Sequence, residues 1–83
     1  MNNKLLITVY VPILEKKFDL FVPASKQTNE TVLLIEKAIK ELSVASYYKE
    51  NLRIYRRDTF EELDYSNSLK KNNIVNGIEL IIL

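Results

Sequence analysis

The two most apolar stretches of this 83-residue chain lie near its two ends, and they constrain the fold more than any other feature. They are residues 5–11 (LLITVYV) and 78–83 (IELIIL). Near-continuous runs of Leu, Ile and Val are typical of strands that are covered on both faces or lie at the centre of a sheet. We therefore expect the first and last strands to lie side by side in the middle of one sheet.

The segment after the first strand predicts a hairpin. Residues 17–22 (KFDLFV) place Phe18, Leu20 and Val22 on one face of a second strand. Pro23 should end this strand, because proline has no amide N–H to donate to the ladder.

A helix is predicted next, with Thr28 or Asn29 as its N-cap and its end at about Leu42. Leu33 and Leu34 should widen its apolar stripe. The stripe itself is predicted from apolar residues spaced three and four apart, which are Val32, Ile35, Ala38, Ile39 and Leu42.

The second half of the chain predicts shorter elements. Residues 43–51 read as a loop, and residues 52–56 (LRIYR) alternate in the manner of a half-buried strand. Residues 60–63 indicate a short edge strand in which Leu63 points inward.

One helical turn is predicted at 68–71, with Leu69 and Ile74 in the core, and a turn at 76–77 leads into the last strand. The helix between the second and third strands supplies the crossover that a parallel central pair needs. The prediction is a single α+β domain over residues 1–83, with a mixed sheet of order 2-1-5-3-4 packed on one helix. A chain of this length has no room for a second core.

This order of elements is similar to the ubiquitin-like, or β-grasp, fold. The likeness is strongest over residues 68–80 (SLKKNNIVNGIEL), where an anchoring leucine and two turns lead into the last strand. More narrowly, residues 18–23 (FDLFVP) and the chain length resemble the small ubiquitin-like accessory proteins of type VII secretion systems in Gram-positive bacteria. That resemblance implies a cytoplasmic accessory or regulatory subunit that is not conjugated to targets. Its partner would be a protein, such as a membrane component of the secretion apparatus.

Composition removes most catalytic designs. The chain has no cysteine and no histidine, so thiolate chemistry, a histidine base and zinc sites built on sulfur or imidazole are absent. We expect no enzyme activity, no catalytic residues, no cofactor and no metal. The net charge is +1, from 12 basic and 11 acidic residues spread along the chain, which argues against nucleic acid and anionic membranes as partners.

Two charged clusters have a structural and a functional interpretation. The carboxylates within residues 61–64 could hold a hard cation, but charges at a sheet edge more often prevent edge-to-edge association. The arginines within residues 53–57 could contact nucleic acid, but the acidic residues nearby favour a solvated strand and turn.

Glycine usage argues against a conjugated modifier. Gly77 is the only glycine, so no Gly-Gly pair is present for conjugation or sulfur transfer. Residues 78–83 are expected to form the last strand, which would hold the terminal carboxylate within the sheet.

Strict alternation along the strands predicts which side chains point away from the helix. An apolar and aromatic patch rimmed by an arginine has the composition of interaction hot spots. We predict an exposed protein-binding patch on the sheet face opposite the helix, formed by Leu6, Tyr10, Arg53, Tyr55, Ile81 and Leu83.

Two functions remain open. The first is a non-catalytic interaction module of a secretion assembly that docks through this patch. The second is a self-associating structural unit of another bacterial complex, in which the patch or the edge of the second strand makes a symmetric homodimer. A cytoplasmic location without membrane insertion is expected, because the sequence shows no signal-peptide pattern and no run of roughly 18 apolar residues.

Overall fold

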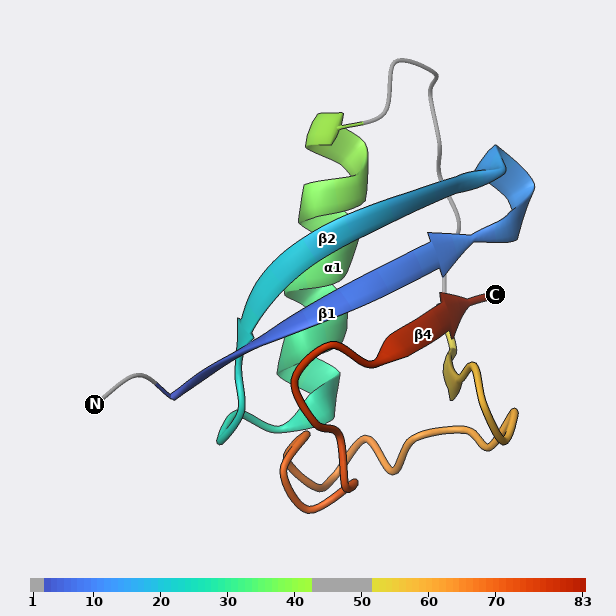
Figure 1. Cartoon of the computed structure of the whole chain (residues 1–83). Helices are drawn as coiled ribbons and strands as arrows, with labels where there is room; N and C mark the ends of the chain where they lie inside the picture. The colour runs from blue at the N-terminus through green and yellow to red at the C-terminus, as the bar shows by residue number, and fades with distance from the viewer. Residues whose placement is uncertain (1–2, 43–51) are drawn as a thin grey trace.

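The computed structural model describes residues 3–42 and 52–83, and the predicted loop at 43–51 lies outside the described residues. The sheet is made from β1 (Lys4–Val11), β2 (Lys16–Pro23), β3 (Ile54–Arg56) and β4 (Glu79–Ile82). A short 3₁₀ turn, η1 (Pro12–Leu14), joins β1 to β2, and the helix α1 (Thr28–Leu42) follows β2. Figure 1 shows this order from the N-terminus to the C-terminus.

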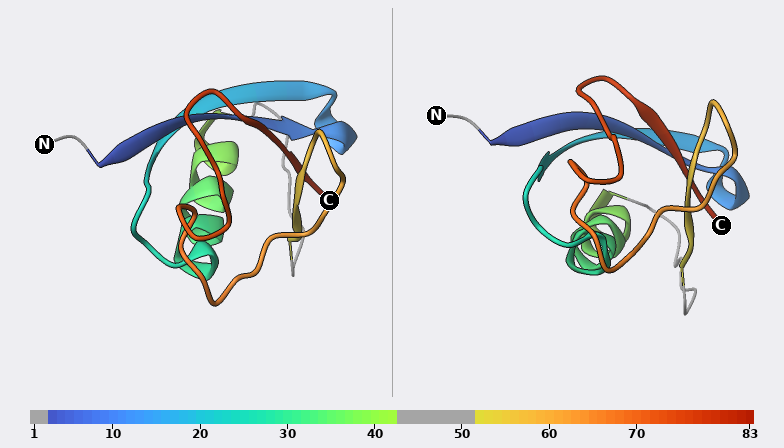
Figure 2. Two further views of the ribbon diagram at one scale, coloured as in Figure 1. Left: turned by 60° about the horizontal axis from the view of Figure 1, so that its bottom comes forward. Right: turned by 90° about the horizontal axis from the view of Figure 1, so that it is seen from below.

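The predicted central pairing is confirmed. The sheet has the order β2-β1-β4-β3, in which β4 is the predicted fifth strand. β1 pairs with β4 in parallel, with Thr8 opposite Glu79 and Tyr10 opposite Ile81, while β2 and β3 pair antiparallel to their neighbours. α1 crosses one face of this mixed sheet (Figures 1 and 2).

The predicted edge strand at 60–63 forms only one bridge to the sheet, between Tyr55 and Glu62. Phe60 has a φ of 62°, and this left-handed conformation turns the chain sharply back on β3. Leu63 then donates its N–H to the carbonyl of Ile54, 3.0 Å away, and its side chain is buried as predicted.

The core lies between α1 and the sheet, and Leu69 and Ile74 belong to it as predicted. The expectation that Leu33 and Leu34 widen the buried stripe is wrong, because Leu33 is 65% exposed and Leu34 is also exposed. Ile35 faces the sheet, and a residue two positions earlier lies on nearly the opposite side of an α-helix.

The start of α1 is held differently from the prediction. Thr28 is buried, and its hydroxyl donates to the carbonyl of Asn67 (2.7 Å) instead of capping its own helix. The first two helical amides donate to loop carbonyls, Thr28 to Asn67 and Asn29 to Tyr65, while the carbonyl of Gln27 accepts from the next turn. Contacts with a distant loop therefore satisfy helix N–H groups that a side-chain cap usually satisfies.

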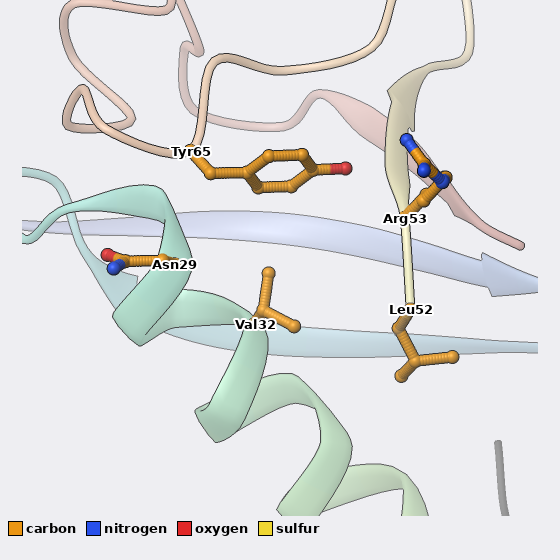
Figure 3. Close-up of a pocket in the computed structure, with 5 residues that line it drawn as sticks. All are labelled: Asn29, Val32, Leu52, Arg53 and Tyr65. Atoms are coloured by element: carbon orange, nitrogen blue, oxygen red, sulfur yellow. The ribbon is translucent and has the colours of Figure 1, made fainter. Parts of the chain in front are cut away.

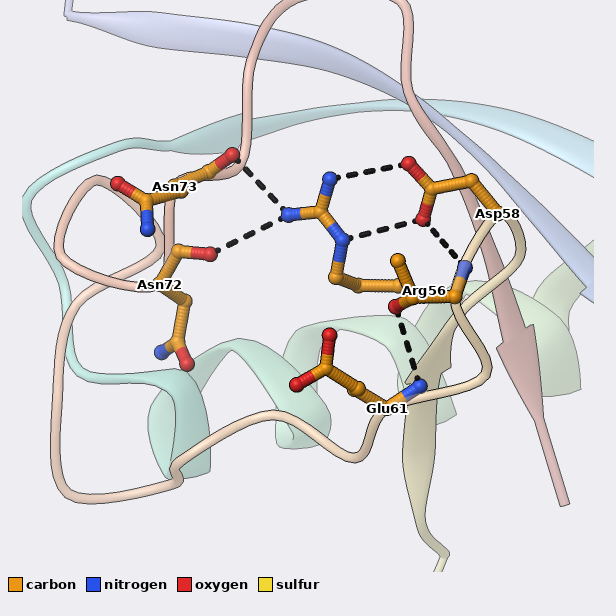
Figure 4. Close-up of polar contacts among 6 residues, drawn as sticks. Arg56, Asp58, Glu61, Asn72 and Asn73 are labelled. Carbon is orange, nitrogen blue, oxygen red and sulfur yellow. Dashed lines mark hydrogen bonds and ion pairs between the residues drawn. The ribbon is translucent and has the colours of Figure 1, made fainter.

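A second link fixes the loop that leads to β4. The guanidinium of Arg56 donates to both carboxylate oxygens of Asp58 (3.1 Å each) and to the carbonyls of Asn72 (3.4 Å) and Asn73 (3.2 Å), as Figure 4 shows. The hydrogen bonds from Arg56 hold the pKa of Asp58 below its usual value. Arg56 is thus committed to joining the β3 turn to residues 72–73.

Asn72 is the polar centre of this loop. Its side-chain amide donates to the carbonyls of Asp64 (2.9 Å) and Ser68 (3.0 Å) and to the hydroxyl of Thr28 (3.1 Å). Its side-chain oxygen accepts the N–H of Asp64 (2.8 Å). One side chain therefore joins the start of α1 to the segment before β4.

Replacing Asn72 should destabilise the fold. Asn72→Ala leaves several partly buried groups unpaired, and we expect a loss of about 2 kcal/mol in the free energy of unfolding. Urea unfolding would measure it. Lys71→Ala, at an exposed neighbouring position, is the matched control, and equal effects of the two substitutions would contradict the role of Asn72.

Candidate protein-binding face

The sheet face opposite α1, called the outer face here, brings three predicted site residues into one row. Tyr10 of β1 lies opposite Ile81 of β4, and Ile81 lies opposite Tyr55 of β3. All three point away from α1, because the alternating neighbours Leu80 and Ile82 belong to the core.

Two further predicted residues form the next outward pair beside this row, where β3 begins and β4 ends. Arg53 and Leu83 are directly opposite each other and exchange both backbone hydrogen bonds, at 3.0 and 2.9 Å. Leu6 lies apart from the others, because Thr8 is the outward residue between Leu6 and Tyr10 on β1. Four of the predicted residues are therefore neighbours on the outer face, Leu6 lies apart, and the side chain of Arg53 binds Glu62 and lines the cavity beside α1.

Ile81 corrects the prediction in one respect. It points to the outer face, but its side chain is only 4% exposed. The half-buried rings of Tyr10 and Tyr55 flank it on the two neighbouring strands, and a cross-strand pair brings side chains to within about 5 Å. Ile81 is thus a buried floor beneath the tyrosines, whereas Leu83 is 38% exposed.

Two exposed aromatic residues belong to the outer face and were missed from sequence. Phe60 is 58% exposed, and its ring centroid lies 5.7 Å from that of Tyr55. Phe21 of β2 is 68% exposed and pairs with Leu6 across the strands. The alternation of Phe18, which faces inward, could have indicated Phe21, whereas the position of Phe60 depends on its turn.

Charged side chains surround the Tyr10 ring. Arg57 lies 5.1 Å from its centroid and the ammonium of Lys17 lies 6.0 Å from it, both within the range of cation–π attraction. The carboxylate oxygen Oε1 of Glu79 is 3.1 Å from Lys17 Nζ and 3.9 Å from Arg57 Nη1. Two cations thus share one carboxylate, which leaves a positive rim beside the aromatic cluster.

A chain of hydrogen bonds supports the β3 side of the face. The N–H of Ile54 donates to the Tyr65 hydroxyl (3.0 Å), which donates to Glu62 (2.6 Å), and Glu62 also accepts from Arg53 (3.0 Å). Burial, together with the bond to Glu62, raises the pKa of Tyr65 to about 12. The hydroxyl of Tyr65, and then the guanidinium of Arg53, hold the pKa of Glu62 below its usual value.

An open surface cavity of about 490 Å³ lies between the start of α1 and β3. Figure 3 shows the Tyr65 ring reaching across it, with the hydroxyl pointing toward β3. The Tyr65 hydroxyl and the Arg53 guanidinium are engaged, because both bind Glu62. The lining residues are Asn29, Val32, Leu52, Arg53 and Tyr65.

Each of the arginines singled out in the sequence is paired with a carboxylate, but of the carboxylates within residues 61–64 only Glu62 takes part. Arg53 faces Glu62, Arg56 faces Asp58 and Arg57 faces Glu79. Within residues 3–42 and 52–83, no three acidic side chains gather in a group that could hold a metal ion.

Comparison with solved structures identifies the architecture. A ubiquitin-like domain of an Arabidopsis thaliana protein matches with a TM-score of 0.73 and 19% identity, over 99% of this chain and 78% of that one. The fold is ubiquitin-like. The ubiquitin-like domain of the Mycobacterium tuberculosis type VII secretion protein EccD1 matches with a TM-score of 0.67 and 16% identity, over 100% of this chain and 99% of that one.

A third match is to a much longer chain, in the MycP5-free ESX-5 inner membrane complex. The TM-score is 0.67 at 13% identity, over 99% of this chain and 21% of that one. No protein-family model and no curated protein matches this ubiquitin-like chain. Among its described residues, no helix is long and apolar enough to cross a membrane.

The buried position of Ile81 in the ubiquitin-like sheet predicts a large effect on stability. Ile81→Ala should lower the free energy of unfolding by about 3 kcal/mol, because truncation leaves a cavity between two tyrosines. Leu83→Ala, at an exposed position directly after the same strand, should cost less than about 1 kcal/mol. Chemical denaturation of both variants would test this, and equal losses would contradict the burial of Ile81.

The lowered pKa of Glu62 predicts that the free energy of unfolding depends on pH in the acid range. Its pKa is lowered on folding, so its contribution is present above its ordinary value of 4.5 and is lost as the pH falls below that value. The urea midpoint of Glu62→Gln should therefore fall less than that of the wild type between about pH 6 and pH 3. Glu61→Gln, which leaves the Tyr65 and Arg53 contacts in place, is the matched control. Identical acid profiles for wild type and Glu62→Gln would refute the linkage.

Proposed function

We propose that this ubiquitin-like domain is a non-catalytic protein-interaction module that docks through its outer face. The observation that carries the proposal is Phe60. A left-handed backbone conformation, such as the φ of 62° at Phe60, costs a bulky residue roughly 1–2 kcal/mol. Here that conformation places a 58% exposed ring beside Tyr55. Strained backbone of this kind is concentrated at functional sites.

The composition around Phe60 supports docking. Tyr10 and Tyr55 present rigid aromatic surface above the buried Ile81, and interaction hot spots are enriched in tyrosine and arginine around a well-packed centre. Arg57 and Lys17 form a charged rim, about half exposed, that can orient a partner. The face therefore has an aromatic centre and a polar border, which is the anatomy of a protein interface.

A non-catalytic role is supported by the chemistry of the chain. Cysteine and histidine are absent from the sequence, and the hydroxyl and guanidinium at the cavity between α1 and β3 are already bound to Glu62. A nucleophile needs a base within hydrogen-bond reach that can accept its proton. The Tyr65 hydroxyl has a raised pKa and donates to a carboxylate whose pKa is lowered, which is the opposite of activation.

We further propose that the domain serves in the cytoplasm as an accessory or regulatory component of a type VII secretion system. Two observations support this assignment. Residues 18–23 resemble the small ubiquitin-like accessory proteins of such systems, and a ubiquitin-like domain of the secretion protein EccD1 shares the fold over the whole chain. A secretion-apparatus protein with a cytoplasmic surface is the partner that this assignment predicts.

Phe60→Gly provides a clean test of the docking face. Glycine relieves the left-handed strain, and the loss of the Tyr55 contact costs a similar amount, so stability should change by less than about 1 kcal/mol. The tagged wild-type domain should capture its partners, including secretion-apparatus proteins, from native extract, as identified by mass spectrometry. The tagged variant should capture none of them.

Leu33→Ser is the matched control, because it removes an equally exposed apolar side chain from α1, on the other side of the molecule. It should capture the same proteins as the wild type. Capture that survives Phe60→Gly would refute the outer face as the docking surface. Capture that depends on Phe60 but contains no secretion-apparatus protein would refute the secretion assignment alone.

A further inference from the structure

The outer edge of β2 carries a row of backbone groups that lack partners within the described residues. Ala24 donates its N–H to the carbonyl of Asn3 (2.8 Å), which fixes the alternation of the β1–β2 ladder. Lys16, Phe18, Leu20 and Val22 therefore bond to β1, and the N–H and C=O groups of the residues between them point away from the sheet.

The same alternation is found independently on β1. Thr8 donates to the carbonyl of Ile78, and Gly77 donates to the carbonyl of Leu6, so the even-numbered residues of β1 bond to β4. Its odd-numbered residues are left to bond to β2. Both ladders thus place the backbone groups of Lys17, Asp19 and Phe21 on the open edge.

The charged side chains that could protect this edge from another strand point over the sheet instead of away from it. Exposed edges are commonly protected by charges, above all by lysine. Here Lys17 reaches across β1 to Glu79, with 3.1 Å between the charged atoms, and Asp19 accepts a hydrogen bond from the Thr8 hydroxyl (2.8 Å). The backbone groups in the middle of β2 are therefore accessible for pairing with another strand.

Self-pairing is favoured by the positions of the open groups along β2. Residues 17, 19, 21 and 23 are symmetric about Leu20. In the antiparallel register centred on Leu20, Asp19 faces the partner's Phe21 and Lys17 faces the partner's Pro23, so no like charges meet. Pro23, which has no N–H, falls at the end of the ladder, where its carbonyl accepts from the partner's Lys17 and the Lys17 carbonyl is left to water.

Neighbouring registers are worse. A register centred on Asp19 places the two aspartates directly opposite each other, which is destabilising. A register centred on Phe18 pairs Lys17 with the partner's Asp19 but is shorter, because Phe21 would have to pair with Glu15, which lies outside β2 with a φ of 53°. A register centred on Phe21 is also shorter, because it leaves Lys17 outside the ladder. The register centred on Leu20 is also the one that uses the whole open edge.

We propose that two copies of this chain associate by antiparallel pairing of their β2 edges about Leu20. The two four-stranded sheets then form one continuous sheet, with both α1 helices on one face and both outer faces on the other. The pairing leaves Tyr10, Tyr55 and Phe60 uncovered, so a dimer presents two docking faces side by side. This association is independent of the partner proposed above.

Sedimentation of the full chain tests the proposal, together with two substitutions at one position. An edge contact of this length buries less than the roughly 1,200 Å² of a stable interface, so the apparent mass should rise toward twofold only between about 10 µM and 1 mM. Phe21→Pro removes an N–H that β1 does not use, and it should hold the mass at one chain. Phe21→Thr keeps that N–H and removes the ring, and it should still dimerise. Circular dichroism would verify that both variants are folded.

Amide hydrogen exchange of the wild type gives a second readout that needs no substitution. The amides of Lys17, Asp19 and Phe21 should exchange fast when dilute and slowly when concentrated, whereas those of Phe18, Leu20 and Val22 should be protected under both conditions. A chain that stays monomeric at the highest concentration would overturn the proposal and leave the edge to a strand of another protein. A dimer without this alternating pattern, or one that survives Phe21→Pro, would overturn it in favour of another surface.

Discussion

Parallel pairing of β1 with β4 is the constraint on which the rest of this ubiquitin-like structure depends. Parallel strands cannot be joined by a tight turn, so everything between them must serve as the connection, and α1 covers the sheet as part of it. The pairing begins where Gly77 donates to Leu6 and Thr8 donates to Ile78. Gly77 has a φ of 87°, a conformation that favours glycine, and it is the single glycine of the chain.

That pairing also builds the candidate site. It places Tyr10 on one side of Ile81, while the β3–β4 pairing places Tyr55 on the other. It brings Glu79 within reach of Lys17, two strands away in the sheet. Because α1 occupies one face of the sheet, the aromatic row and its charged rim are left on the other face, where a second protein can reach them.

Polar anchors away from the sheet hold the irregular half of the chain. Arg56 and Asn72 connect the β3 turn, the 64–73 loop and the start of α1 by hydrogen bonds to backbone carbonyls. These bonds take the place of regular secondary structure between β3 and β4. They also hold in place the turn that carries Phe60. The strained backbone and exposed ring of Phe60 are therefore supported by a well-connected loop.

The sequence by itself determined the four strands of the sheet, the helix, the central parallel pair and the outward direction of Tyr10, Tyr55 and Ile81. Those features follow from local periodicity and from the rules for joining parallel strands. Only the tertiary structure decided that Ile81 is buried, that Leu33 is exposed and that Phe60 joins the docking face. The physical reason is that burial depends on which side chains arrive from other strands and turns, and a left-handed residue such as Phe60 redirects the chain without any periodic signal.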